Sequence, residues 1–139
     1  MNIKLTTSDN FQLDADFHPG TNGKGVIFAH GMTVPRQDEE PFLIAAEKLN
    51  KLGFSTLLFD FRAHGKSQGD PKKDFTISNE LIDLQSAFDF MKSQLLAFQG
   101  ETPEPWIGLA GASFGGGISA LFAGEHSKDI KNSLLLSLF

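Results

Sequence analysis

Three short continuous apolar runs constrain the fold of this chain more than any other feature. They occupy residues 25–30 (GVIFAH), 54–61 (FSTLLFDF) and 104–111 (EPWIGLAG). Runs without polar alternation are typical of strands that are buried on both faces, as in a parallel sheet. A stretch with apolar residues at helical spacing follows each run, at residues 39–53, 75–96 and 114–126. Strands that alternate with helices predict a parallel α/β sheet with right-handed crossovers.

The two ends of the sequence add further strands. Apolar residues alternate strictly near the start, at Ile3 and Leu5 and then at Phe11, Leu13, Ala15 and Phe17. With the turn residues SDN between them, these segments predict an antiparallel β-hairpin. The last run, KNSLLLSLF at 131–139, predicts a further buried strand and about six strands in all. Because such a strand is usually covered on both sides, its place at the end of the sequence predicts a truncated domain. The alternatives are a strand that a partner or a second copy covers, or an uncovered strand that the protein tolerates.

Composition narrows the class of protein. A net charge of −5 argues against a nucleic-acid partner, which favours basic patches. The chain has no cysteine, which excludes disulfides and thiolate metal sites, and no His or carboxylate cluster has ligand spacing, so we expect no metal. No signal region and no apolar run of membrane-spanning length is visible, which predicts a cytoplasmic protein without a membrane span.

A serine surrounded by glycines lies after the third apolar run, in GLAGASFGGG at 108–117. Glycine inside a helix costs about 1 kcal/mol relative to alanine, so these glycines indicate a need for space. The pattern Gly111-x-Ser113-x-Gly115 between a buried strand and a helix is typical of a nucleophile elbow, a strained turn that exposes the serine hydroxyl. We expect Gly111 and Gly115 to relieve crowding at this turn, and Gly116 and Gly117 to let the helix approach the sheet.

Three motifs in order, HGM at 30–32, FDFRAHGKS at 59–67 and GASFGG at 111–116, resemble the α/β-hydrolase superfamily. The sequence is most similar to bacterial acyl-ester hydrolases of the serine-aminopeptidase-like and cinnamoyl-esterase-like groups. The resemblance covers nearly the whole chain but only about the N-terminal half of a family member. It implies an α/β-hydrolase core in which residues 1–139 form the N-terminal part of one domain.

The resemblance also implies roles for individual residues. Ser113 would be the nucleophile, and the backbone N–H groups of Met32 and Phe114 would form the oxyanion hole. His30, Gly31, Gly111 and Gly115 would support this site, and the substrate would be a small acyl ester. No cofactor is implied, because the dinucleotide-like pattern GGGISA at 115–120 begins inside the helix and not directly after the strand.

The sequence departs from the family pattern at the catalytic acid and the catalytic base. In the family, both residues follow the serine in the chain. After Ser113 the sequence offers only Glu125, His126 and Asp129. His126 lies 13 residues after Ser113, about 20 Å along a helix, whereas a general base must come within about 3 Å. His64 is expected to hold the active-site loops, and His18 to be exposed.

Charged residues near the site are expected to be structural or solvated. Asp60 and Arg62 would pair or brace the loop around His64, or form a solvated surface pair. In the helix predicted over 75–96, we expect the acids Glu80, Asp83 and Asp89 to lie on an ordinary solvent-exposed face.

Three functions stay open. The first is serine-dependent hydrolysis of a carboxylic ester, with peptide, amide and thioester substrates as variants. The second is a non-catalytic fragment or binding module that keeps the elbow and needs a partner. In the third, another chain supplies the missing acid and histidine.

Overall fold

The computed structural model describes residues 1–98 and 105–136. Its strands are β1 (Asn2–Thr6), β2 (Gln12–His18), β3 (Lys24–Ala29), β4 (Ser55–Phe59), β5 (Trp106–Ala112) and β6 (Ile130–Leu136). Its helices are the 3₁₀ turn η1 (Arg36–Asp38), α1 (Glu40–Lys51), α2 (Ile77–Leu96) and α3 (Phe114–Glu125). Within those two described ranges, no helix has both the length and the apolar composition needed to cross a membrane.

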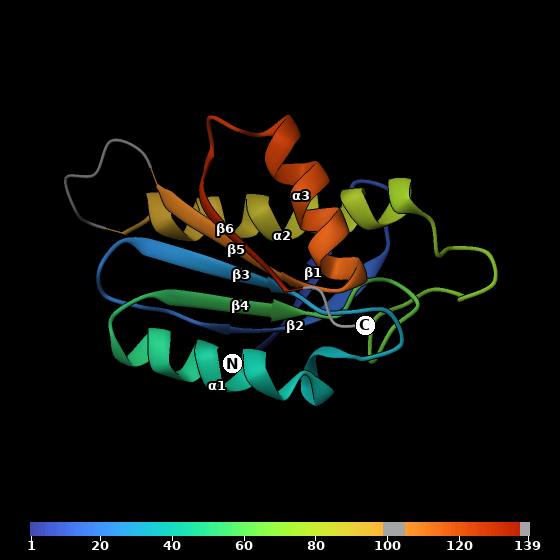
Figure 1. Ribbon diagram of the computed structural model, residues 1–139, viewed down its shortest axis with the longest axis horizontal. Coiled ribbons are helices and arrows are strands. Elements are labelled where there is room, and N and C mark those ends of the chain that lie inside the picture. The colour runs from blue at the N-terminus through green and yellow to red at the C-terminus, as the bar shows by residue number, and fades with distance from the viewer. Residues whose placement is uncertain (99–104, 137–139) are drawn as a thin grey trace.

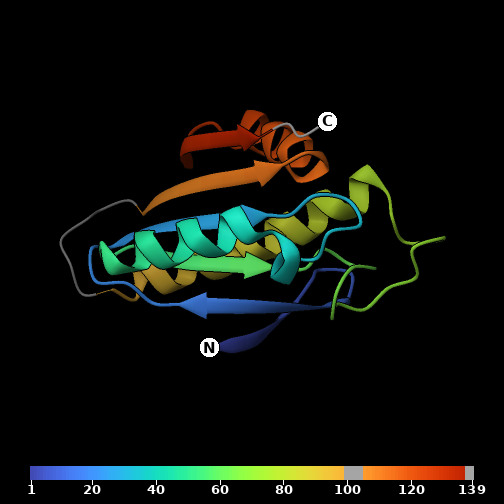
Figure 2. The same cartoon turned by 60° about the horizontal axis from the view of Figure 1, so that its bottom comes forward.

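The strands form one six-stranded sheet in the order β1-β2-β4-β3-β5-β6. The pairs β4–β3, β3–β5 and β5–β6 are parallel, whereas the pairs β1–β2 and β2–β4 are antiparallel. Figure 1 labels the strands, and Figure 2 shows the hairpin of β1 and β2 at one edge of the sheet. The predicted α/β sheet with an N-terminal antiparallel hairpin is therefore confirmed.

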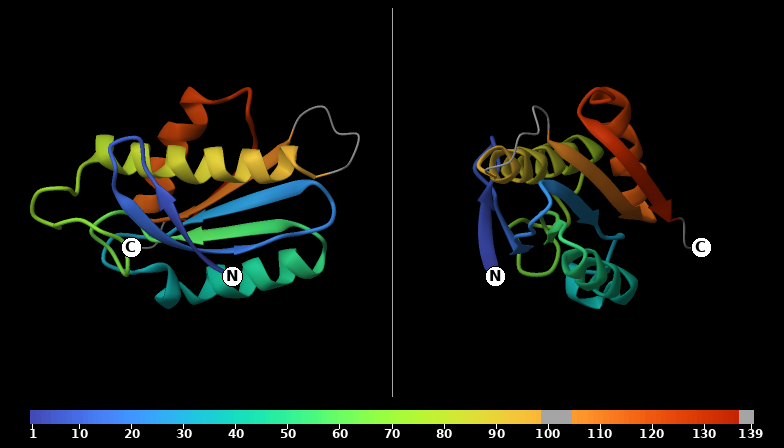
Figure 3. Two further views of the ribbon diagram at one scale, coloured as in Figure 1. Left: turned by 180° about the vertical axis from the view of Figure 1, so that it is seen from behind. Right: turned by 90° about the vertical axis from the view of Figure 1, so that its left-hand side faces the viewer.

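Helices cover both faces of the sheet. Helix α1 lies on one face, and α2 and α3 lie on the other (Figures 2 and 3). Alternate residues of β3 therefore enter two separate apolar clusters: Val26 and Phe28 pack with Phe42 of α1, whereas Ile27 and Ala29 pack with α2 and α3. This double burial is the physical reason why the strand reads as a continuous apolar run.

The element boundaries differ from the sequence prediction at places that matter for the site. Strand β4 ends at Phe59, so Asp60 and Phe61 lie just beyond the sheet. Helix α2 begins only at Ile77, because the Thr76 hydroxyl caps it by accepting the N–H of Asn79 at 3.1 Å. Of the predicted last strand, residues 137–139 lie outside the described residues.

Candidate active site

The carboxyl ends of three neighbouring strands meet at one edge of the sheet. Ala29 of β3 is level with Phe59 of β4 on one side and with Gly111 of β5 on the other. The chain segments that leave these strands therefore start close together, at His30, Asp60 and Ser113. In open α/β sheets this edge is where ligands bind.

Ser113 occupies a strained turn between β5 and α3. Its backbone has φ 51° and ψ −116°, a conformation that costs a residue with a side chain about 1–3 kcal/mol. Ser113 is exposed, and although it precedes the first turn of α3, its side chain makes no capping hydrogen bond. Among the described residues its hydroxyl has no hydrogen-bond partner, which leaves the oxygen available at the surface.

The glycines on either side of Ser113 differ in their need for space. A Cβ on Gly111 would lie 2.5 Å from the Gly115 oxygen, and one on Gly115 would lie 2.2 Å from the His30 oxygen. Both positions therefore exclude a side chain, as the sequence predicts. The Gly116 Cα lies 2.7 Å from that Gly111 Cβ position, again a close approach. The expectation for Gly117 is wrong, because a Cβ there would meet nothing within 4 Å.

The loop after β3 lies directly against the elbow. A Cβ on Gly31 would be 3.5 Å from the Cβ of Ser113, which is ordinary contact. The next residue, Met32, is 48% exposed beside this contact. The backbone N–H groups of Met32 and Phe114 donate to no protein acceptor within residues 1–98 and 105–136, so both are free to bind a ligand oxygen.

His30 is buried beneath this loop and uses both ring nitrogens. Its Nε2 accepts the backbone N–H of Phe61 at 3.0 Å, so its Nδ1 carries the proton and donates to the Gly31 oxygen at 2.7 Å. Burial lowers the pKa of His30 to about 4, which keeps the ring neutral near pH 7. With both nitrogens occupied, His30 orients the loop and is a poor candidate for a general base.

A row of rings connects this histidine to the helix that follows Ser113. The ring of His64 lies 5.1 Å from His30 and 5.4 Å from Phe75, and Phe75 lies 4.9 Å from Phe114. His64 is half-buried, and its Nδ1 lies 2.9 Å from the Arg62 oxygen. These contacts pack the loop after β4 against the start of α3.

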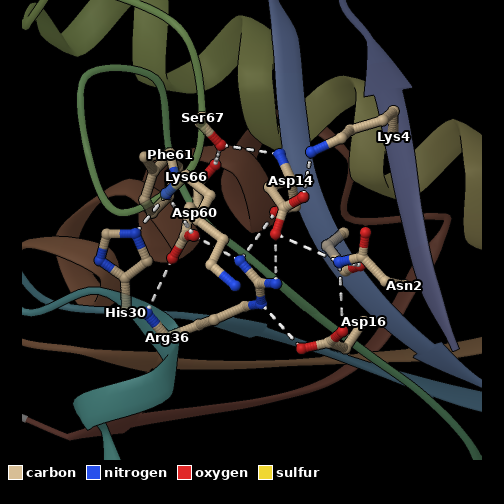
Figure 4. A network of polar contacts seen from close by, with 11 residues as sticks. Asn2, Lys4, Asp14, Asp16, His30, Arg36, Asp60, Phe61, Lys66 and Ser67 are labelled. Carbon is tan, nitrogen blue, oxygen red and sulfur yellow. Dashed lines mark hydrogen bonds and ion pairs between the residues drawn. The ribbon is translucent and has the colours of Figure 1, made fainter.

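A buried ionic network, which the sequence reasoning missed, anchors the loop after β3 (Figure 4). Arg36 is 2% exposed, and its guanidinium forms ion pairs with Asp14, Asp16 and Asp60. Its backbone N–H also donates to Asp60 at 2.9 Å. No periodicity or motif marks Arg36, because its partners come from β2 and from the end of β4, distant in sequence.

Asp60 and Arg62 do not pair with each other and are not solvated, so that part of the prediction is wrong. Asp60 pairs with Arg36 and accepts the backbone N–H of Lys66 at 3.1 Å, which braces the loop around His64. Arg62 is 1% exposed and forms ion pairs with Asp9 and Asp83 at 2.8 Å.

The prediction of a solvated acidic face on α2 is wrong for two of its three members. Asp83 is buried against Arg62, and Glu80 is 0% exposed, with no partner for either carboxylate oxygen in the described part of the chain. Burial, together with the charge of Asp83, raises the pKa of Glu80 to about 9. Asp89 alone is exposed.

No described residue is placed to take a proton from Ser113. His126 lies at the far end of α3, where its ring stacks on Phe122 at 3.9 Å. Asp129 follows it on the surface, and His18 is exposed at the end of β2. Within the described part of the chain, no three His, Asp or Glu side chains are grouped as a metal site.

Known proteins share this architecture. A curated relative, the thiohydrolase aneE of Aspergillus aculeatus, is 33% identical over 82% of this chain and 34% of its own length. Among solved structures, the esterase Pf2001 of Pyrococcus furiosus is 31% identical, with a TM-score of 0.76 over 96% of this chain and 49% of its own. GrgF of Penicillium is 25% identical, with a TM-score of 0.78 over 97% of this chain and 44% of its own.

The chain thus spans half or less of the length of these relatives. A sequence model of the alpha/beta hydrolase fold matches residues 24–138, which include the loop after β3, the loop after β4 and the Ser113 turn. The chain therefore belongs to the alpha/beta hydrolase fold family.

Proposed function

We propose that this protein transfers the acyl group of an ester or thioester to Ser113 and then to water. One observation carries the proposal: an exposed serine in a strained turn lies against the loop after β3, and neither its hydroxyl nor the Met32 N–H of that loop has a partner among the described residues. A second free N–H group follows the serine in the chain. This is the arrangement that acyl transfer requires.

In the proposed reaction, the Ser113 oxygen attacks the acyl carbonyl and its proton passes to a general base. The carbonyl oxygen becomes negatively charged, and the N–H groups of Met32 and Phe114 donate to it. Each such donor is worth about 3 kcal/mol of transition-state stabilisation, and the N-terminal end of α3 adds its positive dipole. The leaving oxygen or sulfur takes the proton, and water then releases the carboxylic acid from Ser113.

The substrate class follows from the site and from the relatives. The relatives include a thiohydrolase and an esterase, which favours an acyl group carried on sulfur or oxygen. The described residues offer no base for Ser113, so the acid and the histidine are proposed to come from another part of the complete protein or from a second chain. A cytoplasmic location stays a prediction from sequence.

Labelling with a fluorophosphonate, read by intact mass, tests the proposal. We expect one adduct, located on Ser113 and absent from Ser113→Ala. Ser119→Ala is the matched control, because Ser119 lies in α3, directly after the Ser113 turn, and its buried hydroxyl has no hydrogen-bond partner among the described residues. Turnover of a p-nitrophenyl ester and a matched thioester then separates the two substrate classes.

A complete protein that is folded and takes no label, alone or with the second chain, would overturn the proposal. That result favours the alternative function, a binding module that keeps the elbow without its chemistry. The specific observation behind this alternative is the lack of a described base near Ser113.

A further inference from the structure

Glu39 is a buried acid directly before α1, and its side chain does not cap that helix. The side chain of the residue before a helix commonly accepts an N–H from the helix's first turn. Glu39 makes no such bond, and it is only 8% exposed. Its Oε2 instead accepts the backbone N–H of Gly31 at 3.2 Å. The carboxylate thus faces the loop that contacts Ser113.

The backbone of Glu39 is firmly held, which makes it a rigid anchor. Its N–H donates to the Arg36 oxygen at 3.3 Å, and its own oxygen accepts the N–H of Phe42 at 2.9 Å. Arg36 is in turn fixed to Asp60 at the end of β4. The carboxylate therefore links the loop after β3 to both α1 and the sheet.

Both sides of Gly31 are held by hydrogen bonds. Glu39 binds its N–H, while His30 Nδ1 donates to its carbonyl oxygen at 2.7 Å and Val34 N–H donates to the same oxygen at 3.4 Å. Because a trans peptide is planar, the Met32 N–H points opposite to the Gly31 carbonyl. Glycine rotates freely about both backbone bonds, so the direction of that N–H depends on both anchors.

We propose that Glu39 is a positioning residue for acyl transfer: by holding the Gly31 N–H, it keeps the Met32 N–H directed at the acyl oxygen on Ser113. This inference rests on the proposed function. The required property is an acceptor of the right length, not a negative charge, because a charge behind the loop does nothing to favour a developing oxyanion. An oxygen at the Glu39 Oε2 position is therefore sufficient.

Two substitutions of Glu39 distinguish the effect of side-chain length from the effect of side-chain charge. Glu39→Gln keeps the reach and an acceptor oxygen but removes the charge. Glu39→Asp keeps the charge but is one methylene too short for Gly31, and aspartate is a favoured residue for capping α1. Glu40→Asp makes the same change at the neighbouring exposed position and is the matched control.

The test measures fluorophosphonate labelling rates of Ser113 and the free energy of unfolding in urea, on the complete protein. We expect Glu39→Gln to label within about threefold of wild type. Glu39→Asp should label about 10-fold to 100-fold more slowly without loss of stability, because its carboxylate caps α1 instead. In ester turnover the Glu39→Asp loss should appear in kcat and not in KM, since the Met32 N–H acts on the transition state.

The outcomes distinguish this inference from the function on which it rests. If wild type labels and Glu39→Asp labels equally fast, the positioning role is wrong and the proposed function stands. If Glu39→Gln slows labelling as much as Glu39→Asp does, the charge matters and the inference is also wrong. If wild type takes no label, the proposed function fails, and this inference fails with it.

Discussion

Two glycines near the start of α3 have opposite surroundings, and replacing each with alanine should change stability in opposite directions. A Cβ on Gly115 would lie 2.2 Å from the His30 oxygen and 2.3 Å from the Ala29 oxygen. A Cβ on Gly117 would have no neighbour within 4 Å. The two changes are chemically identical and two residues apart, so each serves as the control for the other.

The magnitudes follow from these distances. Carbon–oxygen contacts are normally about 3.3 Å or longer, so Gly115→Ala requires α3 and the end of β3 to separate by about 1 Å. The atoms in the way are backbone, which cannot rotate aside, so the overpacking cost should reach about 3 kcal/mol. The higher helix propensity of alanine offsets about 1 kcal/mol of this cost, so the free energy of unfolding should fall by about 2 kcal/mol. Gly117→Ala changes only the helix propensity, so it should raise the free energy of unfolding by about 1 kcal/mol.

Urea denaturation of both variants beside wild type measures the difference, which should be about 3 kcal/mol. With a urea dependence of about 1–3 kcal/mol per molar, the two midpoints should lie at least about 1 M apart. The displacement also moves the loop after β3 away from Ser113, so Gly115→Ala should label with fluorophosphonate about 100-fold more slowly. Equal midpoints for the two variants would refute the argument that α3 packs on the His30 carbonyl.

Two further predictions concern buried ionisable side chains. Because the pKa of Glu80 in the folded protein, about 9, exceeds its ordinary value of 4.5, the folded state holds one proton more between these pH values. The free energy of unfolding should therefore fall with rising pH in this window, by up to about 1.4 kcal/mol per unit, and Glu80→Gln should remove this slope in urea titrations. Parallel pH curves for the two proteins would contradict it. Arg36→Met should lower the free energy of unfolding by about 3–5 kcal/mol, because Asp60 would be buried without its cation and Asp14 would keep only the cation of Lys4. The control Lys51→Met removes an exposed ion pair and should lower the free energy of unfolding by less than about 1 kcal/mol. Similar losses for the two variants would show that the buried network of Arg36 does not stabilise the fold.

The fold was accessible from sequence because its signals are local. Strands buried on both faces read as continuous apolar runs, and the half-buried hairpin reads as alternation, since each pattern is set by the burial of single side chains. Gly111 was also predictable, because the crowding that it relieves arises between the turn around Ser113 and the first residues of α3. Gly115 follows from the same motif, but the atoms that exclude a side chain there are the backbone oxygens of Ala29 and His30. The prediction for Gly117 is wrong, since only the direction in which α3 leaves the turn decides which glycine faces the sheet.

The residues that hold the site were not accessible in this way. Arg36, Glu39 and Glu80 each lie in stretches whose charges look solvated, and nothing within those stretches distinguishes a buried charge from an exposed one. Burial of Arg36 depends on β2 and β4 bringing their carboxylates to the same edge, and the Glu39 contact depends on where η1 turns the chain into α1.

Sequence by itself determined the order of strands and helices, the family, and the serine in its glycine-flanked turn. These features are written in periodicities and short-range sterics that a few neighbouring residues impose on one another. Only the tertiary structure decided which charges are buried, which acid holds Gly31 and which glycine needs its space. Those choices depend on distances between segments far apart in the chain, and electrostatic and close-packing energies act over such distances only after the sheet has formed.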